Sequence, residues 1–157
     1  MKRENVTFKS EGENCAAWLY MPDNLTQPAP TIVMAHGFSL VKEVFLDCYA
    51  KAFCENGFIV LVFDYRNFGE SQGDRPQHLE PYEQIKDYRN AITWVSALPE
   101  VNEEQIGIWG TSYSGGHVLH YTLLILWITI LMIILLGILI FLMSALLFLT
   151  HLVTALL

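Results

Sequence analysis

Before residue 121 the apolar positions fall into short runs separated by turn-forming residues. FIVLVF (residues 58–63) is apolar at every position, which is typical of a parallel-sheet strand covered on both faces. TIVMA (31–35) and IGIWG (106–110) predict two more buried strands. Residues 5–9 and 15–21 predict two short strands on either side of the turn-forming sequence EGEN.

Two segments with helical periodicity lie between the predicted strands. In VKEVFLDCYAKAFCENG (residues 41–57), Phe45, Cys48 and Ala52 recur at helical spacing, and the final Asn-Gly pair is a good helix stop. Residues 82–98 predict an amphipathic helix. Its apolar face consists of Ile85, Tyr88, Ile92 and Val95. The alternation of strands and helices predicts an α/β fold with an open, mostly parallel sheet flanked by helices.

The last part of the chain has a different character. Residues 121–157 contain no Lys, Arg, Asp or Glu and are almost wholly apolar. A membrane helix needs about 20 apolar residues, so the segment is long enough for one tilted span. We therefore expect a domain over residues 1–120 and a long apolar C-terminal helix that enters the lipid bilayer and leaves the domain in the cytoplasm. The flanking Lys or Arg residues that normally set orientation are absent, and a frameshifted or chimeric gene would give the same pattern.

The composition excludes several classes of function. The 157 residues include 9 Lys or Arg and 16 Asp or Glu, so no basic patch is expected for a nucleic-acid partner. Cys15, Cys48 and Cys54 form neither a C-x-x-C pair nor an even disulfide set, which indicates reduced thiols. The N-terminus MKRENVTFKS has no apolar stretch behind its basic residues, so no secretory signal is predicted. No metal or cofactor is expected, and the oligomeric state is left open.

A serine-containing turn follows the last predicted strand directly. The sequence GTSYSGG begins at Gly110 and places Ser112 between small residues. A nucleophile elbow needs such neighbours, because its strained turn leaves no room for large side chains beside the serine. The G-x-S-x-G pattern is met at Gly110 and Ser112, whereas Ser114 stands in its last position. The turn predicts an exposed nucleophile between a buried strand and a helix.

Several longer pieces carry a resemblance to a known family. They are AHGF (35–38), LVFDYRNFGES (61–71), DYRNAITWVSALPEV (87–101) and IGIWGTSYSGGHVL (106–119). With these pieces in this order, the chain resembles the α/β-hydrolase superfamily. It is most similar to the branch of dienelactone-hydrolase-like, polyketide-transferase-like and X-Pro dipeptidyl-peptidase-like proteins. The resemblance covers most of residues 1–120 and implies the N-terminal part of an α/β-hydrolase domain, truncated before its later strands.

The resemblance also implies roles for individual residues. Ser112 would be the nucleophile that attacks an acyl carbonyl in a small-molecule ester or thioester. The backbone N–H groups of Tyr113 and Phe38 would donate to the oxyanion. Residues 64–66, which follow the second buried strand, would border the site and hold its loop in shape.

Other polar residues have structural interpretations at this stage. His36 precedes a glycine turn and is expected to be structural and not the catalytic base. His117 and His120 follow Ser112 along the same helix and are expected to point away from the serine. Asp87 and Arg89 are expected to take part in a helix-surface or helix–loop ion pair and not in chemistry.

The catalytic partners of Ser112 are missing from the sequence. In the family, the acid and the histidine follow the serine in chain order. Beyond Ser112 the sequence contains no Asp or Glu, and its histidines there are His117, His120 and His151. We therefore expect little hydrolysis by this chain alone. Three hypotheses remain open: a serine hydrolase of the ester or thioester type, a catalytically inactive membrane-anchored binding module, and a truncated or frameshifted product without function.

Overall fold

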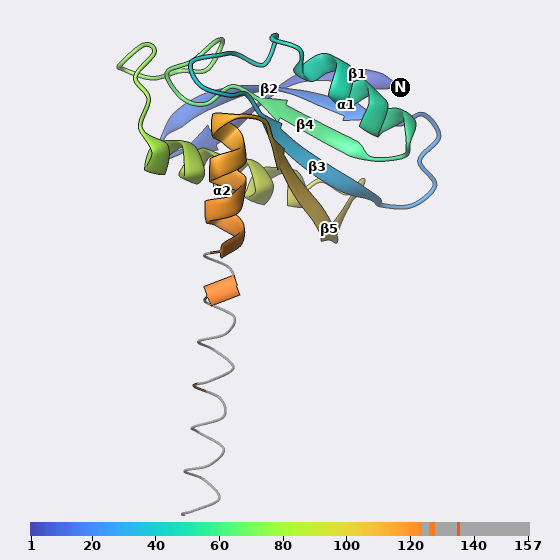
Figure 1. Cartoon of the computed structure of the whole chain (residues 1–157). Helices are drawn as coiled ribbons and strands as arrows, with labels where there is room; N and C mark the ends of the chain where they lie inside the picture. The colour runs from blue at the N-terminus through green and yellow to red at the C-terminus, as the bar shows by residue number, and fades with distance from the viewer. Residues whose placement is uncertain (124–125, 128–134, 136–157) are drawn as a thin grey trace, which may run out of the picture. The chain divides into compact units, whose positions relative to one another are not determined.

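The computed structural model describes residues 1–123, 126–127 and 135. The chain divides into two compact units, Met1–Leu119 and His120–Leu157. The elements of the first unit are β1 (Lys2–Ser10), β2 (Glu13–Met21), β3 (Ala29–Ala35), α1 (Leu46–Glu55), β4 (Ile59–Phe63), α2 (Pro81–Ser96) and β5 (Val101–Gly110), which are shown in Figure 1. A further helix begins at Tyr113.

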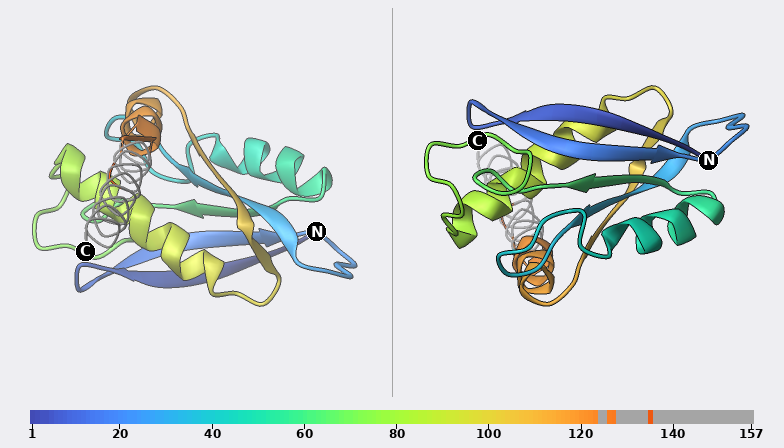
Figure 2. Two further views of the ribbon diagram at one scale, coloured as in Figure 1. Left: turned by 90° about the horizontal axis from the view of Figure 1, so that it is seen from below. Right: turned by 90° about the horizontal axis from the view of Figure 1, so that it is seen from above.

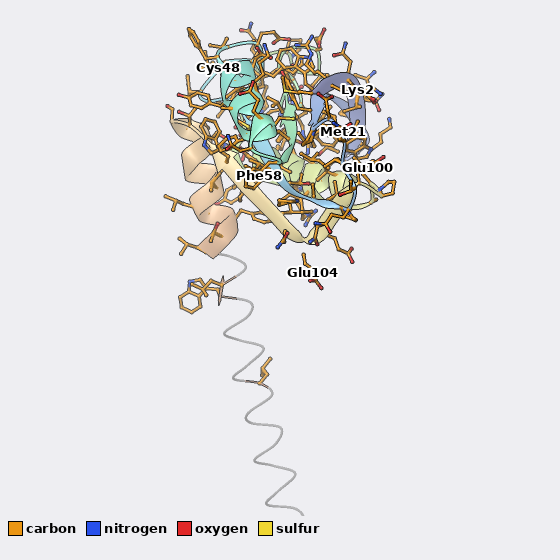
Figure 3. All side chains as sticks on the ribbon, turned by 90° about the vertical axis from the view of Figure 1, so that its right-hand side faces the viewer. Lys2, Met21, Cys48, Phe58, Glu100 and Glu104 are labelled. Carbon is orange, nitrogen blue, oxygen red and sulfur yellow. The ribbon has the colours of Figure 1, made fainter. Side chains whose placement is uncertain are left out.

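The strands form a mixed sheet in the order β1-β2-β4-β3-β5. β3 pairs in parallel with both β4 and β5, whereas β2 runs antiparallel to β1 and to β4. The α/β class is therefore confirmed, but the expectation of a mostly parallel sheet was wrong. The reason is the N-terminal hairpin, in which Lys2 lies opposite Met21 (Figure 3). Its turn residues Glu11 and Gly12 both have positive φ, as two-residue hairpin turns require.

The central strand β4 separates two apolar layers. Ile59, Leu61 and Phe63 face one layer, and Val60 and Val62 face the other. Helix α2 covers the first layer and α1 covers the second, so the two helices lie on opposite faces of the sheet (Figure 2). Every residue of β4 is buried. The continuous apolar run therefore predicted this strand and its two covered faces correctly.

The apolar face predicted for the first helix was wrong. Phe45, Cys48 and Ala52 are all exposed, and the buried positions of α1 are Leu46, Ala50 and Cys54. Phe45 has a left-handed backbone (φ 61°) and precedes the helix without belonging to it. A residue in that conformation cannot continue an α-helix, so the buried face of α1 begins at Leu46 and not at Phe45.

The last strand is longer than predicted and is less buried. β5 begins at Val101, which is its buried residue, and the rest of the strand is half-buried or exposed. Within the described residues β5 pairs with β3 on one side, and its other edge is open. The expectation of a third buried strand was therefore wrong for this part of the chain, because within the described residues β5 has a neighbouring strand on one side only.

The predicted C-terminal helix lies almost entirely outside the described residues. Of residues 121–157, the structure describes 121–123, 126–127 and 135. Among the residues that can be described, no helix has the length and apolarity required to span a bilayer. The membrane span and the cytoplasmic location of the domain remain predictions.

A buried ion pair connects α2 to the loop after β4. Asp87 is fully buried and accepts hydrogen bonds from Arg66 Nη2 at 2.6 Å and from Arg66 Nε at 2.8 Å. Ser10 Oγ donates to the same carboxylate. The helix–loop alternative predicted for Asp87 and Arg89 is therefore confirmed: Asp87 pairs with Arg66 in the loop after β4, and Arg89 reaches Glu11 in the hairpin turn. Burial raises the pKa of Asp87, and the bonds from Arg66 and Ser10 act in the opposite direction.

Replacing Asp87 by Ala is expected to lower the free energy of unfolding by about 3–5 kcal/mol, because Arg66 loses its counter-charge. Urea denaturation measures the loss. Arg89→Ala is a matched control on the same helix, since its exposed pair with Glu11 should contribute less than about 1 kcal/mol. Equal losses for the two variants would contradict the buried role of Asp87.

Candidate active site

The turn that carries Ser112 is strained. β5 ends at Gly110, the next helix begins at Tyr113, and Ser112 between them has φ 54°. A residue with a side chain adopts this left-handed region at a cost of roughly 1–3 kcal/mol, and strained residues of this kind cluster at active sites. The Ser112 residue is exposed. The strained, exposed serine turn predicted from the sequence is therefore present.

Gly110 makes this turn possible. A Cβ atom at Gly110 would lie 2.5 Å from Ser114 Oγ and 2.6 Å from the Ser114 carbonyl oxygen. Backbone atoms cannot move away without opening the turn, so only glycine fits. Gly116, in the helix that follows, has no atom within 4 Å of the corresponding Cβ position.

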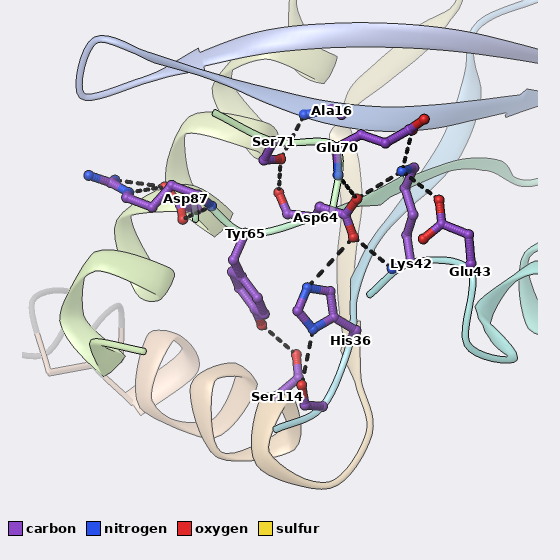
Figure 4. A network of polar contacts seen from close by, with 12 residues as sticks. Ala16, His36, Lys42, Glu43, Asp64, Tyr65, Glu70, Ser71, Asp87 and Ser114 are labelled. Atoms are coloured by element: carbon purple, nitrogen blue, oxygen red, sulfur yellow. Dashed lines mark hydrogen bonds and ion pairs between the residues drawn. The ribbon is translucent and has the colours of Figure 1, made fainter. Parts of the chain in front are cut away.

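Ser114 joins a chain of buried hydroxyl groups. Its Oγ lies 2.8 Å from Tyr65 Oη and 2.7 Å from Tyr88 Oη, and Tyr88 Oη donates to the Trp109 carbonyl at 2.8 Å (Figure 4). Each hydroxyl carries one proton. Because Tyr88 uses its proton on the Trp109 carbonyl, it can only accept from Ser114, and this fixes the direction of the other bonds. Ser114 donates to Tyr88, and Tyr65 donates to Ser114. Burial raises the pKa of Tyr88 to about 12, which keeps its donor proton in place.

The sequence did not predict these hydrogen bonds between buried hydroxyl groups. The serine in the last position of the motif was treated as a small residue that the turn tolerates. Its partners Tyr65, in the loop after β4, and Tyr88, in α2, stand 49 and 26 residues away in sequence. No local pattern signals such a contact.

The loop after β3 lies against the serine turn. A Cβ at Gly37 would lie 3.3 Å from Ser112 Cβ, and the rings of Phe38 and Tyr113 meet edge to face at 5.6 Å between centroids. Within the described residues, neither the Phe38 N–H nor the Tyr113 N–H donates a hydrogen bond. The structure thus brings Ser112, Phe38 and Tyr113 together and leaves both N–H groups available.

Asp64 ties this loop to the end of β4. Its carboxylate accepts hydrogen bonds from the Lys42 backbone N–H at 2.7 Å, from Lys42 Nζ at 2.8 Å and from the Glu70 N–H at 3.1 Å (Figure 4). Lys42 is fully buried, and its Nζ also bonds Glu43 and Glu70. Burial acts to lower the pKa of Lys42, but the carboxylates raise it overall, so the ammonium stays charged. Asp64 was expected to hold the loop; Lys42 was missed, because a lone lysine in a polar segment looks solvated.

The histidines have structural contacts. His117 is buried, its Nε2 lies 2.8 Å from Gln84 Oε1, and its ring packs edge to face on Tyr113. His36 is buried beneath the loop after β3. In the described part of the chain, no side chain forms a hydrogen bond with the Ser112 hydroxyl. A base for Ser112 is therefore not assigned to any described residue.

A parallel strand that leads through a strained serine turn into a helix, with a glycine loop from the neighbouring strand beside it, defines the α/β-hydrolase class. The sequence profile of the X-Pro dipeptidyl-peptidase (S15) family matches residues 11–123, which is well over half of the chain. The chain belongs to this family of α/β-hydrolases.

Individual relatives match the same region. Over 116 residues the chain is 41% identical to the quorum-quenching protein AidA of Acinetobacter baumannii. This match covers 73% of this chain and 38% of AidA. It is 48% identical over 86 residues to the thiohydrolase aneE of Aspergillus aculeatus, covering 55% of this chain and 27% of aneE. The crystal structure of the alpha/beta hydrolase GrgF from Penicillium sp. sh18 superposes with a TM-score of 0.73 at 31% identity, over 77% of this chain and 41% of GrgF. The chain spans less than half the length of these relatives.

Gly110→Ala is expected to lower the free energy of unfolding by about 3 kcal/mol, because the new methyl group overlaps the Ser114 backbone. Gly116→Ala is the matched control: its methyl group meets open space in a helix and should stabilise the protein by about 1 kcal/mol. Urea denaturation of both variants gives the comparison. A Gly110 variant as stable as the Gly116 variant would contradict the geometry of the turn.

Ser114→Ala is expected to destabilise the protein by about 1–3 kcal/mol, because the buried Tyr65 hydroxyl loses its acceptor. Ser96→Ala serves as the control, since its hydroxyl bonds only the Thr93 carbonyl on the outer face of α2 and should change stability by less than about 0.5 kcal/mol. Thermal and urea unfolding report both changes. A neutral Ser114 variant would show that the hydroxyl chain makes no net contribution.

Proposed function

We propose that this chain supplies the nucleophile and the oxyanion donors of a serine hydrolase or acyltransferase that acts on small-molecule esters or thioesters. The observation that carries the proposal is the strained, exposed Ser112 beside the unpaired N–H groups of Phe38 and Tyr113. The substrate class is supported by membership of the family and by the similarity to a protein named a thiohydrolase.

In the proposed reaction, Ser112 Oγ attacks the acyl carbonyl carbon and forms a new C–O bond. The carbonyl oxygen becomes negatively charged and accepts hydrogen bonds from the Phe38 and Tyr113 N–H groups. The Tyr113 N–H is one of the first in its helix, where N–H groups lack helical partners and the helix dipole favours negative charge. The Ser112 proton passes to solvent water. The tetrahedral intermediate then expels an alkoxide or a thiolate, which takes up a proton from solvent, and leaves an acyl group on Ser112. Water or another acceptor removes that group in a second step.

The proton acceptor limits the rate. A serine hydroxyl without a base is a poor nucleophile at neutral pH. Enzymes whose base has been removed retain about a thousandfold to ten-thousandfold acceleration over water from the oxyanion hole and substrate binding. Since no described residue accepts the Ser112 proton, we expect acylation of Ser112 in this chain to be slow but measurable.

A fluorophosphonate probe tests the proposal directly. Ser112 Oγ would form a bond to phosphorus while fluoride and the serine proton leave as HF, so the protein would gain the mass of the probe minus HF. We expect slow, single-site labelling that peptide mass spectrometry places on Ser112. Ser112→Ala should abolish the labelling, whereas Ser96→Ala on the outer face of α2 should retain it.

The negative outcome is equally informative. If the protein is folded by circular dichroism but Ser112 stays unlabelled after prolonged exposure, the proposed acyl-transfer function is wrong. That result would favour a module that binds an acyl ligand without reacting with it.

A further inference from the structure

One buried histidine makes contacts that neither apolar packing nor base catalysis explains. His36 is the first residue after β3, and its side chain is 1% exposed. Its ring packs edge to face on Tyr65, with centroids 4.7 Å apart, and also contacts Phe68 at 5.7 Å. These neighbours fix the plane of the imidazole, so the positions of its two nitrogens are set by the fold.

One of these nitrogens has a hydrogen-bond partner and the other has none. His36 Nδ1 lies 3.0 Å from the Gly37 carbonyl oxygen. A carbonyl oxygen only accepts hydrogen bonds, so Nδ1 carries the proton. Nε2 is the buried side-chain nitrogen that lacks a hydrogen-bond partner within the described residues. It lies 3.8 Å from Asp64 Oδ1, which is too long for a hydrogen bond.

The surroundings favour a neutral His36 ring with its proton on Nδ1. Asp64 already accepts three hydrogen bonds, two from Lys42 and one from the Glu70 N–H, so it does not require a further donor. Burial lowers the pKa of His36, although the Gly37 carbonyl and the carboxylates of Asp64 and Glu43 act to raise it and Lys42 acts to lower it. The neutral ring then has one donor, and it points at Gly37.

This single donor controls a peptide group of the candidate site. No peptide bond of the described residues is cis, so the carbonyl of Gly37 and the N–H of Phe38 point in opposite directions. The Gly37 oxygen also accepts from the Leu40 N–H at 3.4 Å, which closes a turn beside the His36 contact. Two donors therefore hold the carbonyl on the inner side of the loop. The Phe38 N–H is turned away from the buried ring and stays unpaired among the described residues.

We propose that His36 is a positioning residue for the oxyanion site: its Nδ1–H, bonded to the Gly37 carbonyl, fixes the peptide whose other end presents the Phe38 N–H beside Ser112. The inference rests on the proposed function, because it assigns Phe38 as an oxyanion donor. His36 touches no reacting atom in this role. Its action is to hold one donor in the orientation that a developing oxyanion requires, so that no reorganisation is needed during the reaction.

Two variants of His36 separate positioning from packing. His36→Asn removes the ring but keeps an amide N–H donor close to the position of Nδ1, whereas His36→Leu has similar bulk and no donor. Loss of one oxyanion donor lowers rates by about a hundredfold or more. We therefore expect His36→Leu to slow fluorophosphonate labelling of Ser112 by about tenfold to a hundredfold, and His36→Asn to stay within about threefold of the unmodified protein. A purely structural role would slow both variants alike, and that result would overturn the proposal.

The tautomer of His36 supplies a test that does not depend on reactivity. Nitrogen-15 NMR of the full chain at pH 7, with His36→Asn used to assign the signal, distinguishes Nδ1–H from Nε2–H and from the imidazolium ion. We expect the neutral Nδ1–H form, and either of the other forms would overturn the inference. If the unmodified protein is not labelled at all, the proposed function fails, and the tautomer alone then decides whether the His36 contact to Gly37 stands.

Discussion

The parallel pairing of β3 with β4 on one side and with β5 on the other is the constraint on which the site depends. Ala35 lies opposite Phe63 in one pair and opposite Gly110 in the other, so three strands end at the same level of the sheet. The loop with Phe38, the residues after β4 and the serine turn therefore meet without any of these segments being long. Chain segments far apart in sequence become neighbours because parallel strands point the same way.

Polar contacts connect the segments that follow these strand ends. The three consecutive residues after β4 each bind a different part of the fold. Asp64 binds Lys42, Tyr65 binds Ser114, and Arg66 binds Asp87. Buried ion pairs contribute little net stability compared with apolar groups of the same shape, but each accepts few alternative geometries. The segment after β4 thus fixes the loop with Phe38, the serine turn and α2 relative to one another, which is the precision that a reactive site needs.

The sequence predicted the features whose cause is local. The unbroken apolar run of β4 gave a buried strand, and the small residues around Ser112 gave a strained turn, since both depend on neighbours in the chain. The apolar face of α1 was misplaced for a local reason, the left-handed backbone of Phe45, whereas the missed contacts of the site involve partners that the chain brings from a distance. For Asp87 both a helix-surface and a helix–loop pair were expected, but its partner Arg66 stands 21 residues earlier in the sequence, so the helix pattern could not identify it. Lys42 and Ser114 gave no local signal, because a buried ammonium or hydroxyl is defined only by what surrounds it.

The hydroxyl chain under the serine turn has a direction. Tyr65 donates to Ser114, Ser114 donates to Tyr88, and Tyr88 donates to the carbonyl of Trp109. The Trp109 carbonyl oxygen can only accept a hydrogen bond, so it fixes the direction in which Tyr88, Ser114 and Tyr65 each donate. The three hydroxyl groups consequently act as one unit, in which a change at Tyr88 alters the acceptor available to Ser114 and therefore also the bond from Tyr65.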